Sequence, residues 1–239
     1  MIDGLIQRLR VRDDVSDEEE EALRGLISET EEFPARVTVL RREKLLDRSV
    51  LLLEGLMCRS KDLPDGQRQI TALHVPGDFL DLHGFTLKRL DHDVMSLAPS
   101  KVAYAPHDRL IRLTEQYPHL TRLLWLTTNL DAAMHREWVL SLGQRSGAQR
   151  SAALFCEIHT RLSVVGKAIN RRFEFPLNQT ELGECLGLTV VHTNRVLREL
   201  REIGLVTFRR GGVQIHDLEA LETFAEFDPA YLYLEKLSR

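Results

Sequence analysis

The chain has 239 residues, 43% of them hydrophobic, which is enough for two domains of ordinary size with buried cores. It has no run of about eighteen apolar residues and no basic-then-apolar leader, so we expect a cytoplasmic protein with no membrane partner. Its three cysteines, Cys58, Cys156 and Cys185, are far apart, which argues against a disulfide framework or a closed zinc site. We expect each to be a buried small hydrophobe.

The formal net charge of −4 is unevenly distributed along the chain. Residues 13–32 carry ten acidic side chains and a single basic one, and residues 166–215 carry eight basic and five acidic side chains. Because duplex DNA binds basic surfaces, the second region is the candidate nucleic-acid binder. We interpret residues 16–31 as a solvated helix whose buried stripe is Leu23, Leu26 and Ile27.

From residue 35 to about residue 110, short β-prone segments alternate with turn residues, a pattern that predicts an antiparallel β-roll. The expected strands are residues 37–40, 49–58, 69–75 and 101–104, with turns at residues 62–66 and 75–78. Residues 49–58 carry hydrophobic side chains on both faces, as expected for a strand between two layers.

Residues 110–143 predict one long helix with an apolar stripe too wide for a free surface helix. We interpret it as a dimerisation helix; the alternative is a helix packed wholly inside its own subunit. Residues 144–149 follow as a hinge, whose flexibility would let a sensor domain set the separation of two DNA readers. The stripe consists of Leu120, Leu123, Leu124, Thr127, Leu130, Met134, Trp138 and Leu142.

The next segments predict a helix-turn-helix. A supporting helix at residues 150–166 and a short strand at 173–177 lead to Asn178, which can cap a first helix with Glu181 as its capping-box partner. Gly187 interrupts the apolar spacing, and Thr189 can cap a second helix. Residues 205–215 then predict a strand, a glycine turn and a strand, with Arg209 and Arg210 at the tip. This pattern favours a winged helix-turn-helix.

The outward face of the second helix carries side chains suited to DNA. Val191, Asn194, Arg195 and Arg198 follow helical spacing, with His192 beside them. Arg195 can donate two hydrogen bonds to guanine, Asn194 can pair with adenine, and Val191 can meet a thymine methyl group. We predict base reading by Val191, His192, Asn194 and Arg195, and phosphate contacts by Thr189, Arg198, Arg209 and Arg210. The alternative is an amphipathic helix whose polar face is merely solvated.

Residues 186–205, LGLTVVHTNRVLRELREIGL, resemble the DNA-binding domain of the Crp/Fnr superfamily of transcriptional regulators. Residues 76–82, PGDFLDL, resemble the cyclic-nucleotide-binding fold of the family's sensor domain. The resemblance implies an α+β protein with a cyclic-nucleotide-binding-like β-roll (1–109), a long dimerisation helix (110–143), a hinge (144–149) and a C-terminal winged helix-turn-helix (150–239). The family commonly has Glu where this chain has Val191, so an acceptor for a cytosine amino group is absent and the target sequence should differ.

The resemblance also bears on the effector. Nucleotide-binding relatives carry a phosphate-clamping arginine in the region that matches residues 90–94, and this chain has no arginine there. Asp91 and Asp93 would repel a phosphate, although Arg89 could substitute if the loop shifted. Residues 1–57 contain no cysteine for an iron-sulfur cluster. We therefore predict no cofactor and no cyclic nucleotide.

Two other effectors stay open. A haem needs one axial histidine, and Cys58, next to Arg59, is a candidate thiol sensor with little basic surrounding to activate it. The histidines in the β-roll are His74, His83, His92 and His107.

We therefore expect a sequence-specific transcriptional regulator that binds a palindromic operator as a homodimer, with an unknown effector. Its partners would be double-stranded DNA, a second copy of the chain and, as a further candidate, RNA polymerase. The alternative is a ligand-, haem- or redox-sensing protein whose winged helix binds another protein. No nucleophile-base set, phosphate loop or metal-spaced histidine pair occurs, so we do not expect an enzyme.

Overall fold

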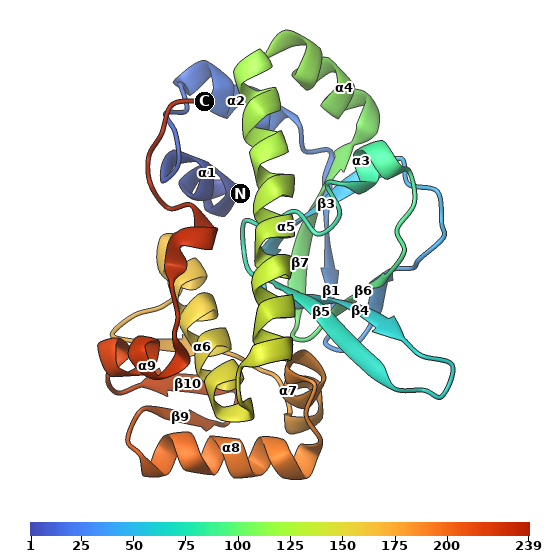
Figure 1. Ribbon diagram of the computed structural model, residues 1–239. Coiled ribbons are helices and arrows are strands. Elements are labelled where there is room, and N and C mark those ends of the chain that lie inside the picture. The colour runs from blue at the N-terminus through green and yellow to red at the C-terminus, as the bar shows by residue number, and fades with distance from the viewer. The chain divides into compact units, whose positions relative to one another are not determined.

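The computed structural model describes residues 1–239, which form two compact units (Figure 1). Unit 1 comprises Met1–Ser60, Leu73–Ala132 and Tyr233–Arg239, and unit 2 comprises Lys61–Ala72 and Ala133–Leu232. This division differs from the expected boundaries at 109, 143 and 149. The C-terminal tail belongs to unit 1 because its backbone is held there: the Leu237 amide donates to the Arg12 carbonyl at 2.9 Å, and the Arg239 amide donates to Asp13 at 2.8 Å.

The predicted β-roll is confirmed as two antiparallel sheets of order β1-β7-β3 and β2-β6-β4-β5. Two strands were not predicted: β1 carries three glutamates, and β6 is short. Residues 16–31 were wrongly predicted as one helix, because β1 pairs with β7 along its whole length and local propensity is overridden. The strands are β1 (Glu29–Phe33), β2 (Thr38–Leu40), β3 (Arg48–Glu54), β4 (Met57–Asp62), β5 (Arg68–His74), β6 (Asp93–Ser96) and β7 (Ser100–Pro106).

Residues 49–58, predicted as one strand, comprise nearly all of β3 and the start of β4, separated by a turn at Gly55. Gly55 has φ +95°, and a Cβ there would lie 2.2 Å from Ser100 Oγ, so only glycine fits. The two-sided burial of β3 is confirmed: Val50 and Leu52 belong to the hydrophobic core inside the roll, whereas Leu51 packs with the helices.

The predicted helix at residues 110–143 is two helices. Tyr117 leaves the helical conformation (φ −122°, ψ 83°) and Pro118 starts the second helix, as expected for a residue without a backbone N–H group. Leu120, Leu123 and Leu124 are buried in their own unit's core, so this part of the predicted dimer seam is wrong and matches the alternative interpretation. The helices are α1 (Asp3–Arg10), α2 (Asp17–Gly25), α3 (Gly84–Leu87), α4 (His107–Gln116) and α5 (Pro118–Gln144).

Unit 2 contains the predicted winged helix-turn-helix. Its core is built on α6, whose Phe155 packs with Phe175 and Phe208, while Phe175 also packs with Phe173, in a cluster of aromatic rings. A sheet of order β8-β10-β9 forms the wing. No helix of the chain is long and apolar enough to span a membrane. The elements are α6 (Gly147–Val164), β8 (Arg172–Glu174), α7 (Gln179–Leu186), α8 (Val190–Glu202), β9 (Val206–Arg209), β10 (Gly212–Ile215), α9 (Leu218–Ala225) and the 3-10 helix η1 (Pro229–Leu232).

The predicted hinge at residues 144–149 is shorter than expected. Helix α5 continues through Gln144 and α6 begins at Gly147, which leaves Arg145 and Ser146 between them. Ser146 caps α6 through a full capping box with Gln149. The serine makes a helix start favourable here, which the flanking glycines had obscured.

Candidate nucleic-acid interface

The helix-turn-helix consists of α7 and α8 joined by a tight turn. Asn178 caps α7 as predicted: the Glu181 amide donates to Asn178 Oδ1 at 2.9 Å, and the Asn178 amide donates to Glu181 Oε2 at 2.8 Å. Gly187 ends α7 with φ +63°, the left-handed conformation typical of helix C-termini. Thr189 then caps α8 by accepting the His192 amide at 3.3 Å, so both predicted caps are confirmed.

The close approach of the two helices depends on Gly183. A Cβ at this position would lie 2.5 Å from the Leu188 carbonyl oxygen and 3.1 Å from Thr193 Oγ1. Thr193 is fully buried and donates its hydroxyl to the Thr189 carbonyl at 3.0 Å. The turn therefore fixes the direction of α8 relative to α7 through direct backbone contact.

One face of α8 is buried and the opposite face is open. Thr193, Val196 and Leu200 face the core of unit 2. Asn194, Arg195 and Arg198 are exposed, and their side chains have no hydrogen-bond or ion-pair partner in the chain; Val191 is 81% exposed. The sequence thus grouped these four correctly on one surface, which we call the reading face: Val191, Asn194, Arg195 and Arg198.

His192 has a different environment from the reading face. It is half-buried, and its Nε2 lies 3.2 Å from the place where a Cβ on Gly147 would stand. Val196 and Leu188 are equally close to the same point. The ring therefore lies beside the start of α6, and base reading by His192 stays a prediction.

The wing presents two further arginines. Strands β9 and β10 pair from Gly212 with Arg209 to Ile215 with Val206, and the tip turns at Arg210 (φ 52°) and Gly211 (φ 72°). Arg209 and Arg210 are exposed and without a partner in the chain. In Figure 1 the β9–β10 pair lies beside α8 in the same unit. Exposed cations on both elements can neutralise DNA phosphates.

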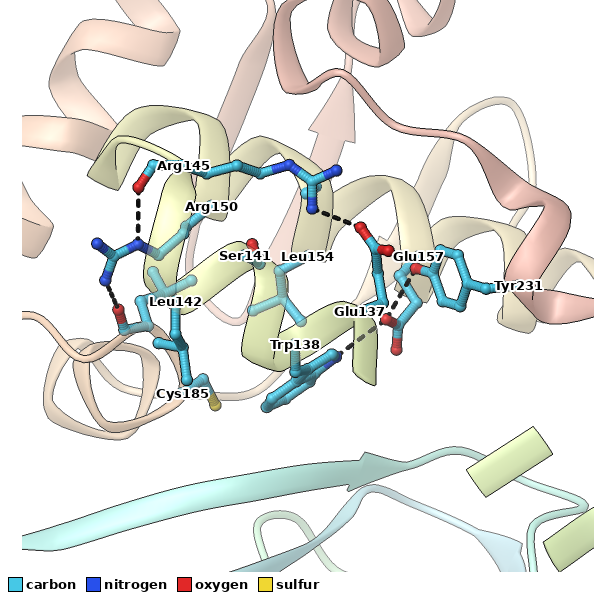
Figure 2. A pocket seen from close by; sticks show the side chains of 12 residues that line it. Glu137, Trp138, Ser141, Leu142, Arg145, Arg150, Leu154, Glu157, Cys185 and Tyr231 are labelled. Carbon is cyan, nitrogen blue, oxygen red and sulfur yellow. Dashed lines mark hydrogen bonds and ion pairs between the residues drawn. The ribbon is translucent and has the colours of Figure 1, made fainter. Parts of the chain in front are cut away.

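A small pocket lined by side chains from the end of α5, from α6, from α7 and from η1 lies beside the helix-turn-helix (Figure 2). The buried Glu157 carboxylate accepts from Trp138 Nε1 at 3.0 Å, the Tyr231 hydroxyl at 3.0 Å and Arg161 at 2.8 Å. Burial and the Glu157 carboxylate raise the pKa of Tyr231, which keeps its hydroxyl a donor. This network ties three helical segments together beside the α5–α6 joint.

Unit 1 contains a separate buried polar cluster around Arg59. The guanidinium donates to the Leu80 carbonyl at 2.7 Å and pairs with Asp131 of α5. Burial raises the pKa of Asp81 to about 7, and burial with the Arg59 charge lowers the pKa of His83 to about 4. Asp81 Oδ1 accepts the Val50 amide at 2.6 Å, whereas its Oδ2 has no hydrogen-bond partner.

The region where relatives clamp a cyclic phosphate is occupied by internal contacts. Asp91 pairs with His92 Nδ1 at 2.8 Å, Asp93 accepts the Arg42 amide at 2.7 Å, and Arg89 is exposed. The structure does, however, supply a buried arginine that the sequence reasoning missed, Arg59. It follows Cys58 in a strand that reads as ordinary β-structure, so no local signal marked it.

The candidate cofactor ligands are mostly enclosed. His74, His92 and His107 are at least nine-tenths buried, and Ser49 Oγ lies 3.3 Å from His107 Nε2. No group of three or more His, Cys, Asp or Glu side chains is arranged to hold a metal ion. Cys58, Cys156 and Cys185 are not joined in disulfides, and all three are buried, as predicted. Burial raises the pKa of Cys156, which keeps it a thiol.

Comparisons with known proteins agree with this architecture. A model of the cyclic nucleotide-binding domain matches residues 30–117, and a model of the Crp-like helix-turn-helix domain matches residues 149–224. A probable transcriptional activator of Rhizobium leguminosarum bv. viciae is 31% identical over 176 residues, covering 72% of this chain and 70% of the relative.

Two further relatives come from Bradyrhizobium. The nitrogen fixation regulation protein FixK of Bradyrhizobium diazoefficiens is 28% identical over 194 residues, covering 81% of this chain and 80% of the relative. The structure of FixK2 from Bradyrhizobium japonicum matches with a TM-score of 0.76 at 21% identity, covering 83% of this chain and 98% of that one. The chain thus shares its fold with FixK2.

Proposed function

Because the chain belongs to the Crp/Fnr family of transcription regulators, we propose that it binds a palindromic operator as a homodimer through the reading face of α8. The observation that carries this proposal is the open, unpartnered state of Asn194, Arg195 and Arg198. Charged side chains left without protein partners on a helix-turn-helix suit a partner that supplies acceptors, as base edges and phosphates do.

The side chains divide into two roles. Arg195 can bind guanine O6 and N7 with two hydrogen bonds, Asn194 can bind adenine, and Val191 can contact a thymine methyl group. Arg198, Arg209 and Arg210 can hold phosphates. The start of α8, which Thr189 caps, is a further candidate phosphate site, because the N-terminus of a helix favours a negative charge.

A second copy of the chain is the proposed partner of α5. Trp125, Ala132 and Val139 recur every seven residues on this helix and are exposed, Trp125 by 67% and Val139 by 70%. An exposed apolar line with heptad spacing is typical of a coiled-coil contact, and a two-fold axis makes the same stripe self-complementary. Trp125→Glu should therefore yield monomers in analytical ultracentrifugation, whereas a dimer of unchanged stability would contradict this surface.

Dimer symmetry leads to the operator. Two recognition helices related by a two-fold axis reach successive major grooves about one DNA turn apart, so the half-sites should form an inverted repeat. The relatives named above are a probable transcriptional activator and a nitrogen fixation regulation protein, which supports a role in transcription. RNA polymerase is a further candidate partner, the cytoplasm is the proposed location, and we assign no catalytic activity.

The test is DNA binding by the Arg195→Ala variant. Loss of a bidentate guanine contact should cost about 1–3 kcal/mol on cognate DNA and relax the preference at one base pair. Arg41→Ala, which removes an exposed and unpartnered arginine of unit 1, is the matched control and should bind like the parent. Equal binding of cognate and scrambled DNA by parent and Arg195→Ala would favour a protein-interaction surface instead.

A further inference from the structure

The tip of the β4–β5 hairpin contacts the first helix of the helix-turn-helix within unit 2. Residues 61–72, which include the end of β4 and the start of β5, belong to this unit. Arg68 donates from Nε and Nη2 to Glu184 Oε2 of α7, at 2.9 and 2.8 Å. The neighbouring Gln69 donates from Nε2 to the backbone carbonyl of Glu184.

These contacts complete the C-terminal end of α7. The last carbonyls of a helix have no intrahelical donor and need partners from elsewhere. The Leu188 amide donates to the Gly183 carbonyl at 3.0 Å, and Arg150 donates to the Leu186 carbonyl at 2.7 Å. Gln69 supplies the donor for Glu184, so a residue far away in the sequence caps the helix.

The ion pair beside this cap is partly shielded from water. The side chains of Arg68 and Glu184 are 29% and 17% exposed, and two guanidinium nitrogens share one carboxylate oxygen. A shielded, charge-assisted contact is less weakened by salt and solvent than a fully exposed pair.

Whatever holds α7 also holds the reading face. Gly183 packs so closely against the turn that the position of α7 constrains the position of α8. The residues of the reading face are exposed, and none of them takes part in the hairpin contact. The contact therefore does not cover the DNA-binding residues. Its effect is to restrict the direction in which α8 presents them.

We propose that Arg68 and Gln69 are positioning residues for DNA recognition: the hairpin tip clasps α7 and thereby fixes the direction of α8. This inference rests on the proposed DNA-binding function. The root of the same hairpin lies in unit 1, where Arg59 of β4 binds Leu80 and Asp131. Strand β4 connects this buried cluster to the hairpin tip that carries the contact between Arg68 and Glu184.

The experiment compares operator binding by the full-length parent, Arg68→Glu, and the charge-swapped double variant Arg68→Glu with Glu184→Arg. Arg68→Glu should weaken operator binding about tenfold and lose the parent's preference for one half-site spacing over spacings a base pair longer or shorter. The double variant should regain both properties, because the swapped charges attract again. If Arg68→Glu had simply unfolded the protein, adding Glu184→Arg would not restore the spacing preference.

Two further variants keep the test decisive. Glu184→Gln preserves the size of the side chain, removes its charge and should show the same loss in milder form. Arg112→Glu breaks an exposed ion pair with Asp108 on α4 and should leave affinity and spacing unchanged. The proposal is overturned if Arg68→Glu and Glu184→Gln keep the parent's affinity and spacing preference, or if they bind the operator more tightly. It is also overturned if the charge-swapped double variant does not recover these properties. If the parent itself does not distinguish operator from scrambled DNA, the proposed function fails instead.

Discussion

Replacing Gly183 with alanine tests the packing that directs the recognition helix. The new Cβ would stand 2.5 Å from the Leu188 carbonyl oxygen, which is backbone and cannot rotate away, and 3.1 Å from Thr193 Oγ1. Overpacking of this kind costs about 1–3 kcal/mol, whereas glycine to alanine inside a helix gains up to about 1 kcal/mol. At 2.5 Å the clash is severe, so we expect a net loss of about 1–2 kcal/mol in the free energy of unfolding.

Gly143 provides the matched control for this substitution. It is also helical, in α5, and a Cβ there would meet nothing within 4 Å. Gly143→Ala should therefore stabilise the protein by up to about 1 kcal/mol in urea denaturation, and Gly183→Ala should destabilise it and weaken operator binding. The reasoning is refuted if Gly183→Ala is as stable as the parent or more stable.

Three other predictions concern charge. The pKa of Asp81 is raised from 3.8 to about 7, so the folded state holds the proton more tightly than the unfolded state and stability falls as the pH rises from about 4 to about 7. Asp81→Asn removes this effect, so its stabilisation relative to the parent should grow by roughly 2–3 kcal/mol between pH 5 and pH 8. A difference in unfolding free energy between variant and parent that does not change with pH would exclude this cause. Replacing Arg209 and Arg210 with alanine should reduce the salt dependence of DNA binding by about two phosphate contacts without changing the preferred sequence; an altered consensus would instead make them base readers. Glu157→Gln leaves buried donors without a charged acceptor and should cost about 3 kcal/mol in denaturation, a prediction that a change below about 0.5 kcal/mol would rule out.

The DNA-binding unit was predictable because its signals are local. Asn178 and Thr189 are caps whose side chains bond amides three residues away, and Gly187 stops α7 by its own backbone conformation. The reading face follows from helical periodicity alone, so the open surface of Val191, Asn194, Arg195 and Arg198 needed no tertiary information. Their contacts with DNA stay predictions.

The errors arose where distant segments decide the structure. Glu29–Phe33 is a strand because it pairs with β7, and nothing in its glutamate-rich sequence indicates that partner. Leu120 and its neighbours have the spacing of an apolar helix stripe, but the spacing does not show whether their own subunit or a second copy of the chain covers that stripe. The pairs Arg59–Asp131 and Arg68–Glu184 each join residues more than 70 positions apart in the sequence, so no local pattern indicates them.

The most direct test of the central claim is selection of binding sites from random duplex DNA by the purified full-length protein, in moderate salt and without an added effector. The account predicts enrichment of an inverted repeat whose half-sites are about one DNA turn apart. If Arg195→Ala abolishes the enrichment, the protein recognises the enriched DNA sequence through the reading face. Recovery of a single asymmetric half-site would contradict the homodimer, and the absence of any enriched sequence would contradict sequence-specific recognition by α8 in the ligand-free protein.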